Sequence, residues 1–314
     1  MAVEANRIIH PKSKSFSSLK KAVAFAALGM QLLASPMITG CATPSFKNAV
    51  KTALAERVDV NAPLYDGKIS YFGKTMLIGG ICGNEHFMDS VLEYSEYIET
   101  INLLIAKGAD VNAKDDGGTT ALMCAAQNGD AVVARLLIAK GADVNARNMY
   151  GMTPLMWAAY ESHNKETVEL LIAKGADVNA TDYRGDTALM DAAYFRYDTG
   201  IAEILIANGA DVNAKDDDGT TVLMNAIWNW RSTDIAEILI TKGADVNAKD
   251  NYGRTALMCA AGDFREHVEK VKLLIAKGAD VNAKDDGGTT ALMNASGDSH
   301  TKTAEILRKH GATK

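Results

Sequence analysis

The pentapeptide Ala-Asp-Val-Asn-Ala recurs along this chain at a nearly constant interval. It begins at residues 109, 142, 176, 210, 244 and 279, so that successive copies lie 33, 34, 34, 34 and 35 residues apart. A degenerate earlier copy occupies residues 58–62. Self-similarity at a period of this length indicates a repeat architecture. In such an architecture each repeat buries its apolar face against its neighbours, so the repeats must stack.

Each period contains the signals for a turn and two short helices. A turn segment such as 147–152 leads to a threonine, whose hydroxyl is a good N-cap for a helix that follows. In one copy the next residue is Pro154, which is tolerated at the first helical position. The second helix is expected to end at a glycine in the left-handed conformation. The cap threonines are Thr75, Thr120, Thr153, Thr187, Thr221, Thr255 and Thr290, and the glycines are Gly108, Gly141, Gly175, Gly209, Gly243, Gly278 and Gly311.

The segment Thr153-Pro154-Leu155-Met156 and its counterparts resemble the ankyrin repeat, whose signature is Thr-Pro-Leu-His-x-Ala. The resemblance covers residues 45–314. It implies an all-α solenoid of stacked helix-turn-helix repeats with β-turn or hairpin tips. Methionine replaces the family histidine at Met123, Met156, Met190, Met224, Met258 and Met293, and Ile78 replaces it in the first repeat. We expect any hydrogen bond from that imidazole to be lost, while methionine fills the same space.

The repeat pattern predicts the domain boundaries. Residues 41–61 are expected to form a linker and an N-terminal capping helix, and residues 62–314 seven repeats, of which the last is a C-terminal cap. The first repeat is irregular, because 33 residues separate Thr75 from Gly108 whereas 21 separate Thr120 from Gly141. We expect the extra 12 residues as an insertion between the two helices, near residues 85–99.

Residues 1–40 have the pattern of a signal peptide. A polar, basic segment precedes the apolar run 22–34, which is short for a permanent membrane span. The following Ile38-Thr39-Gly40-Cys41 resembles the lipobox of bacterial lipoproteins, and this resemblance implies cleavage before Cys41 and lipidation of its thiol. In enteric-type bacteria an aspartate directly after the lipidated cysteine resembles a signal for retention in the inner membrane. Residue 42 is alanine, so the outer membrane is the expected destination. The alternatives are an ordinary signal peptide, which would leave a secreted protein, and a buried N-terminal helix.

The charge of the chain argues against nucleic acid as a ligand. The whole chain carries 33 cations and 39 acids, for a net charge of -6. Residues 1–40 contain five cations and one acid, so the remainder has 28 cations against 38 acids and a net charge of -10. A surface that binds phosphate backbones is normally basic.

The ankyrin resemblance implies a protein partner that contacts the turn tips and the first helices. At 100° per residue, positions 2, 5 and 6 after the cap threonine share one face, and positions 4, 7 and 8 share the opposite one. The first set is small and apolar, which predicts the core. The second set varies, and aromatic and arginine side chains often anchor interfaces. An alternative is that some aromatics, Trp157 and Trp228 first, only fill gaps between helices. The candidate binding residues are Tyr150, Trp157, Tyr160, Tyr183, Arg184, Tyr194, Phe195, Trp228, Tyr252 and Arg254.

No motif in the chain predicts a metal site, a cofactor site or a catalytic centre. The six histidines lack metal-ligand spacing. Four cysteines are too few for a disulfide framework, and Cys124 and Cys259 are expected to lie too far apart to pair, which would leave bare thiols. A thiol enzyme that uses Cys82, His86 and Asp89 is the weak alternative, since no pocket is evident. The sequence therefore favours an exported, lipid-anchored and monomeric scaffold at the bacterial cell envelope, with an unknown protein partner.

Overall fold

The computed structural model describes residues 46–55, 59–61, 76–82, 91–161, 165–195, 199–229, 233–263, 267–295 and 301–313. Several predictions fall outside these residues: the signal peptide 1–40, the lipid site Cys41, the cap Thr75, the insertion residues 85–90, and the His86 and Asp89 partners of the thiol-enzyme alternative. The chain divides into two compact units, residues 1–124 and residues 125–314, and each is described by itself.

The described residues of unit 1 form three helices and the start of a fourth. They are α2 (Phe46–Ala55), α3 (Met76–Cys82), α4 (Val91–Ala106) and α5 (Ala121–Gln127), the last of which crosses into unit 2. Helix α4 packs against both α2 and α3. The side chains that fill this core are Val50, Leu77, Ile78, Ile81, Ile101 and Leu104, all of which are buried.

The insertion in the first repeat is in large part an extension of its second helix. Helix α4 begins at Val91, so residues 91–99 are helical and are not a connecting loop as we expected. The reason is visible in the spacing of its buried residues, because Tyr97, Ile101 and Leu104 recur at i, i+4 and i+7 along one helical face. Lys47 of α2 forms ion pairs with Glu96 and Glu99 on this helix, at 3.5 and 3.3 Å.

A disulfide joins the first helices of the first two repeats. Cys82, at the end of α3, is bonded to Cys124 of α5, with their Cα atoms 4.8 Å apart. The expectation that Cys124 is a bare thiol was therefore wrong: its partner is Cys82 in the adjacent repeat. The same bond also uses the Cys82 thiol, which the thiol-enzyme alternative needs as its nucleophile. Cys259 is the free cysteine among the described residues, and loss of solvation raises the pKa of its thiol to about 12.

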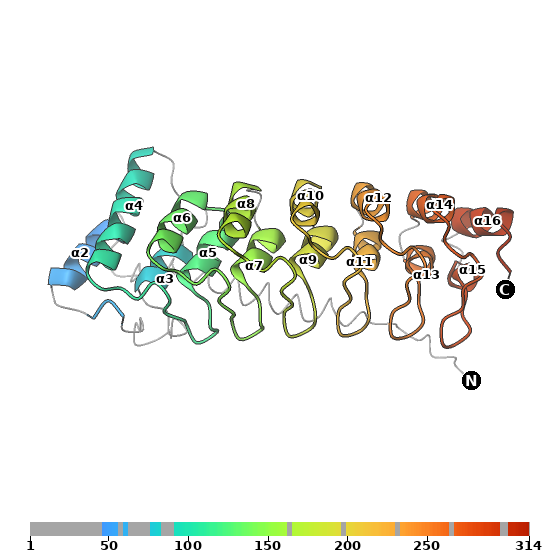
Figure 1. The fold of residues 1–314 in the computed structure, drawn as a ribbon, viewed down its shortest axis with the longest axis horizontal. Helices are drawn as coiled ribbons and strands as arrows, with labels where there is room; N and C mark the ends of the chain where they lie inside the picture. Colours follow the sequence, from blue (N-terminus) through green and yellow to red (C-terminus); the bar gives the residue numbers. More distant parts are fainter. Residues whose placement is uncertain are drawn as a thin grey trace, which may run out of the picture. The chain divides into compact units, whose positions relative to one another are not determined.

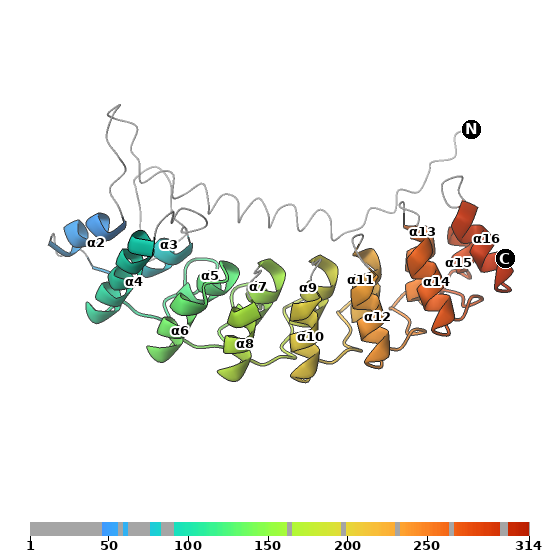
Figure 2. The same cartoon turned by 90° about the horizontal axis from the view of Figure 1, so that it is seen from above.

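Unit 2 consists of helix pairs that follow one another along the chain (Figures 1 and 2). Helix α6 (Ala131–Ala139) is followed by five pairs: α7 (Pro154–Glu161) with α8 (Lys165–Ala173), α9 (Ala188–Phe195) with α10 (Gly200–Ala207), α11 (Val222–Trp228) with α12 (Asp234–Thr241), α13 (Ala256–Gly262) with α14 (Val268–Ala276), and α15 (Ala291–Asn294) with α16 (Thr301–Lys309). The first helices of successive pairs pack together, as do second helices such as α8 and α10. The described residues form isolated β-bridges but no sheet.

The predicted caps and core are confirmed. In each described repeat from α5 onward, the cap threonine accepts a hydrogen bond from the backbone N–H of the methionine three residues later, at 3.2–3.4 Å. All seven predicted glycines have φ between 86° and 98°. The predicted core residues Leu155, Ala158 and Ala159 are buried. Together these local signals define the two helices of each repeat.

In two repeats the methionine that stands in place of the family histidine makes a hydrogen bond of its own. In two repeats the methionine sulfur accepts a hydrogen bond from the backbone N–H of the cap threonine: Met123 from Thr120 at 3.5 Å and Met156 from Thr153 at 3.4 Å. Both methionines are buried. A thioether is a weak acceptor. The prediction concerned only the hydrogen bonds of the imidazole, and it did not foresee that the methionine sulfur would accept one.

Asparagine side chains bridge successive repeats on the side of the Ala-Asp-Val-Asn-Ala loops. Asn213 donates from Nδ2 to the carbonyl of Gly243 at 3.1 Å, and its Oδ1 accepts from the N–H of Asp245 at 2.8 Å. The same two bonds recur in unit 2 at Asn145, Asn179, Asn247 and Asn282, with Thr313 as the last donor. The asparagine of each repeat thus satisfies the end of the next second helix, where carbonyls lack a helical partner.

One buried lysine departs from the repeat pattern. Lys270 of α14 donates from Nζ to the backbone carbonyls of Ala226 at 3.2 Å and Ile227 at 2.7 Å, and also to that of Asn229, all near the end of α11. Burial lowers the pKa of Lys270 to about 8, although nearby Asp263 opposes the shift. In the other second helices of unit 2 the equivalent residues are uncharged and buried, namely Val133, Thr167, Ile201, Ile235 and Thr303.

Candidate protein-binding surface

Each hairpin of the unit 2 repeats has a shape that is set by one aspartate or asparagine side chain, which is buried at Asn148, Asp216 and Asp250 and half-buried at Asp182 and Asp285. Asp182 accepts hydrogen bonds at Oδ1 from the N–H groups of Arg184, at 2.8 Å, and Asp186, at 2.9 Å. The same arrangement holds at Asn148, Asp216, Asp250 and Asp285. Short Asx side chains are suited to this because they bond the backbone two residues on. These carboxylates therefore hold the turn and are not free to bind ligands.

A line of main-chain hydrogen bonds joins the hairpin tips of unit 2. The N–H of Tyr183 donates to the carbonyl of Tyr150 at 3.0 Å, and the next tips continue with Asp217 to Arg184, Asn251 to Asp218, and Asp286 to Tyr252, at 2.9–3.1 Å. A glycine is needed where adjacent tips meet. A Cβ on Gly185, whose φ is +77°, would lie 2.9 Å from the backbone of Asp216 and Asp217. The tips thus form one fixed row, here called the hairpin strip: residues 147–153, 181–187, 215–221, 249–255 and 284–290.

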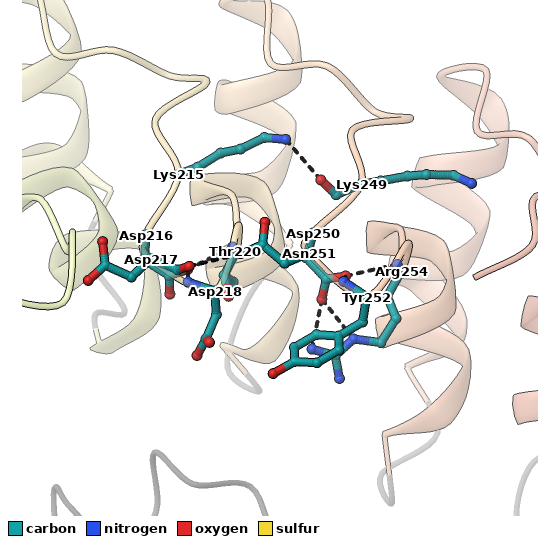
Figure 3. A network of polar contacts seen from close by, with 10 residues as sticks. All are labelled: Lys215, Asp216, Asp217, Asp218, Thr220, Lys249, Asp250, Asn251, Tyr252 and Arg254. Atoms are coloured by element: carbon teal, nitrogen blue, oxygen red, sulfur yellow. Dashed lines mark hydrogen bonds and ion pairs between the residues drawn. The ribbon is translucent and has the colours of Figure 1, made fainter. Parts of the chain in front are cut away.

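The cations of the hairpin strip are largely engaged within it (Figure 3). Lys215 donates from Nζ to the carbonyl of Lys249 at 2.9 Å, and Lys249 donates to that of Lys284 at 2.7 Å. Arg254 pairs with Asp250 at 2.7 Å, and its guanidinium carbon lies 4.9 Å from the centre of the Tyr252 ring. Because the Asp250 side chain is fully buried, this ion pair holds the arginine against the hairpin.

Large apolar side chains are exposed mainly on the hairpin strip. Among the described residues there are six such side chains, and four of them lie at the tips: Met149 (56% exposed), Tyr150 (47%), Tyr183 (68%) and Tyr252 (55%). The other two, Val132 and Met293, lie on helices. Aromatic side chains and methionine are enriched in the parts of protein surfaces that bind other proteins. The hairpin strip is therefore the best candidate interface in unit 2.

The comparisons with known proteins agree with the fold. A family model described as ankyrin repeats (3 copies) matches residues 87–182, 181–250 and 248–314. The chain belongs to the ankyrin-repeat family. Among solved structures it is similar to the ankyrin repeat domain of Bcl-3, described as a unique member of the IkappaB protein family, with 28% sequence identity and a TM-score of 0.59. That match covers 75% of this chain and 99% of the other. No curated protein matches the chain.

The sequence-predicted binding residues separate into several groups. Tyr150, Tyr183 and Tyr252 are exposed at the tips, and Arg184 and Arg254 are partly exposed beside them. Tyr194 and Trp228 are half-buried on the first helices. The side chain of Phe195 lies outside the described residues. Of the two arginines, Arg254 contacts the Tyr252 ring.

The varied face of the ankyrin first helices is less open than its sequence suggested. Trp157 and Tyr160 on α7 are only 7% and 5% exposed, so we correct their assignment to a freely accessible surface. Asp191 and Asn225, which occupy the same position as Trp157 in later repeats, are also buried. The helical-wheel argument missed this because it treats one helix at a time, and burial depends on the whole set of neighbours. The alternative of a packing role fits Trp157 better.

Met149 is a candidate that the sequence-based reasoning missed. It is exposed at a hairpin tip beside Tyr150. The signal was an apolar residue at the tip of a turn, where polar residues and glycine are usual. Sequence reasoning counted only aromatic and arginine side chains as anchors. The exposed apolar part of the hairpin strip therefore extends one residue further than predicted.

The described part of the chain has neither a cluster of metal ligands nor a membrane-spanning helix. No group of three or more histidine, cysteine, aspartate or glutamate side chains there is placed to hold a metal ion. No described helix is both long enough and apolar enough to cross a membrane.

Proposed function

We propose that this ankyrin-repeat protein is an exported scaffold that holds a protein partner at the bacterial cell envelope. The family supports the coarser part of this statement, because ankyrin repeats act as scaffolds for protein–protein interaction. The observation that carries the proposal is the gathering of four of the six exposed large apolar side chains on the hairpin strip.

The way the strip is built favours binding by a preformed surface. Its tips are joined by main-chain hydrogen bonds, and an aspartate or asparagine side chain holds each turn. A surface that is already ordered loses little conformational entropy when a partner binds. Tyrosine adds to this, since it offers a large contact area with only two rotatable side-chain bonds.

Two features support export and anchoring. The lipobox-like Ile38-Thr39-Gly40-Cys41 provides a thiol for lipidation, and the Cys82–Cys124 disulfide is of a kind that persists mainly in oxidising compartments. The alternative is a secreted interaction protein with a cleaved leader and no lipid. Mass spectrometry of the mature N-terminus separates the two: a lipid-modified Cys41 supports the anchor, and an unmodified N-terminus elsewhere contradicts it.

The interface is tested by replacing the three exposed tyrosines, Tyr150, Tyr183 and Tyr252, with alanine. Crosslinking in intact cells should capture the native partner with the original protein and lose most of it with the triple variant. Removal of interface anchors typically costs ~2 kcal/mol or more each. The control is Val132→Ala, which shortens an exposed apolar side chain on α6, away from the strip. Equal capture by the triple variant would contradict this interface.

A further inference from the structure

We propose that the partner docks a basic polypeptide segment on the C-terminal half of the hairpin strip, against Asp217, Asp218, Tyr252 and Asp286. This inference rests on the proposed function, because it names the chemistry of the partner for the same surface. It follows from how the charges of the hairpins are distributed between internal contacts and solvent.

Most of the positive charges of these hairpins are engaged in internal contacts. Lys215 and Lys249 each donate to a carbonyl of the following hairpin, and Arg254 is held by the buried Asp250. Removing Arg254 from its ion pair would leave a buried carboxylate without its partner, which is costly, whereas the two lysine contacts are exposed to water. Lys284, which begins the last hairpin, is exposed and makes no such contact among the described residues. Arg254 in particular is therefore poorly placed to recognise an acidic partner.

Three carboxylates of these hairpins are exposed to solvent and unpaired within the described part of the chain. Asp217, Asp218 and Asp286 are exposed, and their carboxylates make no hydrogen bond or ion pair among the described residues. Figure 3 shows the Asp218 carboxylate and the Tyr252 ring extending from one side of the hairpin row, while Lys215 and Lys249 extend along the other side. In this view the Asp218 carboxylate and the Tyr252 ring, with Arg254 beside it, lie apart from the amines of Lys215 and Lys249.

The helices next to the strip add no competing positive charge. The first helices of the unit 2 repeats, α7, α9, α11, α13 and α15, contain no lysine or arginine. Because opposite charges on two partners steer their encounter and disfavour wrong partners, this side of unit 2 selects for cations.

The chemistry favours a polypeptide over a metal ion or a nucleic acid. The free carboxylates belong to different hairpins, and no described group of residues is placed to hold a metal. Free carboxylates repel the phosphate backbone of a nucleic acid. An exposed tyrosine ring beside carboxylates instead suits lysine or arginine side chains, which combine ion pairing with contact to an aromatic face. The Tyr183 ring, 68% exposed, extends this chemistry toward the middle of the strip.

The test uses the full chain and two variants with the same change of net charge. The first is Asp217→Asn, Asp218→Asn and Asp286→Asn. The control is Glu169→Gln, Glu237→Gln and Glu305→Gln, which neutralises three exposed carboxylates on second helices. The probe is a 15-residue unstructured peptide that alternates lysine with serine and glycine and carries one photo-crosslinking residue, with a glutamate peptide as its opposite.

We expect the lysine peptide to bind the original protein and the control variant equally, to bind the aspartate variant about tenfold more weakly, and to crosslink to the hairpin strip. Binding should also weaken as salt is raised, because exposed charges are screened. Equal weakening by both variants, crosslinks that map elsewhere, or tighter binding of the glutamate peptide would each overturn the inference. If native capture still requires the three tyrosines while the aspartate variant behaves normally, this inference fails and the proposed interface stands.

Discussion

The first helix pair, α3 and α4, and the helix pairs of unit 2 carry the same motifs but differ in what holds them. In unit 2, each repeat adds the same threonine cap, asparagine bridge and tip-to-tip hydrogen bond. In unit 1, where the second helix is longer, a disulfide and the ion pairs of Lys47 are present in addition. A regular repeat is thus stabilised by many equal, weak bonds, whereas the irregular one has a covalent bond.

The asparagine bridge is common to both regions and shows how the irregular repeat is accommodated. Asn61 donates to the carbonyl of Gly108, which lies 47 residues further along, whereas Asn145 donates to that of Gly175, 30 residues further along. The bond is the same although the intervening chain is longer. Extra residues between two fixed points add only a slowly rising entropic cost, so the repeat tolerates them once its ends are held.

The largest expected effect comes from removing the disulfide. Cys82→Ser with Cys124→Ser should lower the stability of unit 1 by up to about 4 kcal/mol, because the bond closes a loop with a sequence separation of 42. Hydrogen exchange should show faster exchange in α3 and α4 and unchanged exchange in α9 and α10. Reduction of the original protein should reproduce the effect. Cys259→Ala removes a free thiol and is the control for α3 and α4; unchanged protection in the double variant would contradict the comparison.

A smaller effect on stability, confined to unit 2, is expected from the titration of Lys270. Its pKa is lowered from 10.5 to about 8, so the unfolded chain binds more protons than the folded one between these pH values. Stability should therefore rise with pH in this window, by about 2 kcal/mol between pH 8 and pH 10. The rise should disappear in Lys270→Met.

The measurement for Lys270 is urea unfolding at several pH values, with each variant compared with the original protein at the same pH. Lys272→Met is the control, because Lys272 is an exposed neighbour on the same helix, paired with Glu269 at 2.9 Å. An identical pH dependence in the original protein and in Lys270→Met would show that the buried amine does not titrate in this window.

The smallest effect is expected for a single asparagine bridge. Asn213→Ala removes the hydrogen bonds to Gly243 and Asp245 and should cost about 1 kcal/mol, since these bonds are exposed to water. Asn208→Ala, which loses a bond only to Ile204 within its own helix, should cost less. The midpoint of urea unfolding reports both changes. A larger loss for Asn208→Ala would mean that the bridges do not link the repeats energetically.

Much of the candidate site was predictable, and the errors have two causes. The exposed tyrosines Tyr150, Tyr183 and Tyr252 were identified from their place in the turns, because a turn tip projects into solvent by its local geometry. Trp157 and Tyr160 were misplaced because their burial depends on neighbours outside their own helix. Met149 was missed because the prediction counted only aromatic and arginine side chains as anchors, although an apolar residue at a turn tip was visible in the sequence.

The amino-acid sequence by itself determined the repeat, the two helices within it, their threonine and glycine ends and the leucine and alanine core. These features depend on residues within a few positions of one another, and the period repeats them. Only the tertiary structure decided which cysteines pair, where Lys270 donates its hydrogen bonds, and which carboxylates remain free on the hairpin strip. The disulfide and the Lys270 hydrogen bonds join residues 41 to 44 positions apart, and periodicity specifies that repeats stack without specifying which side chains then meet.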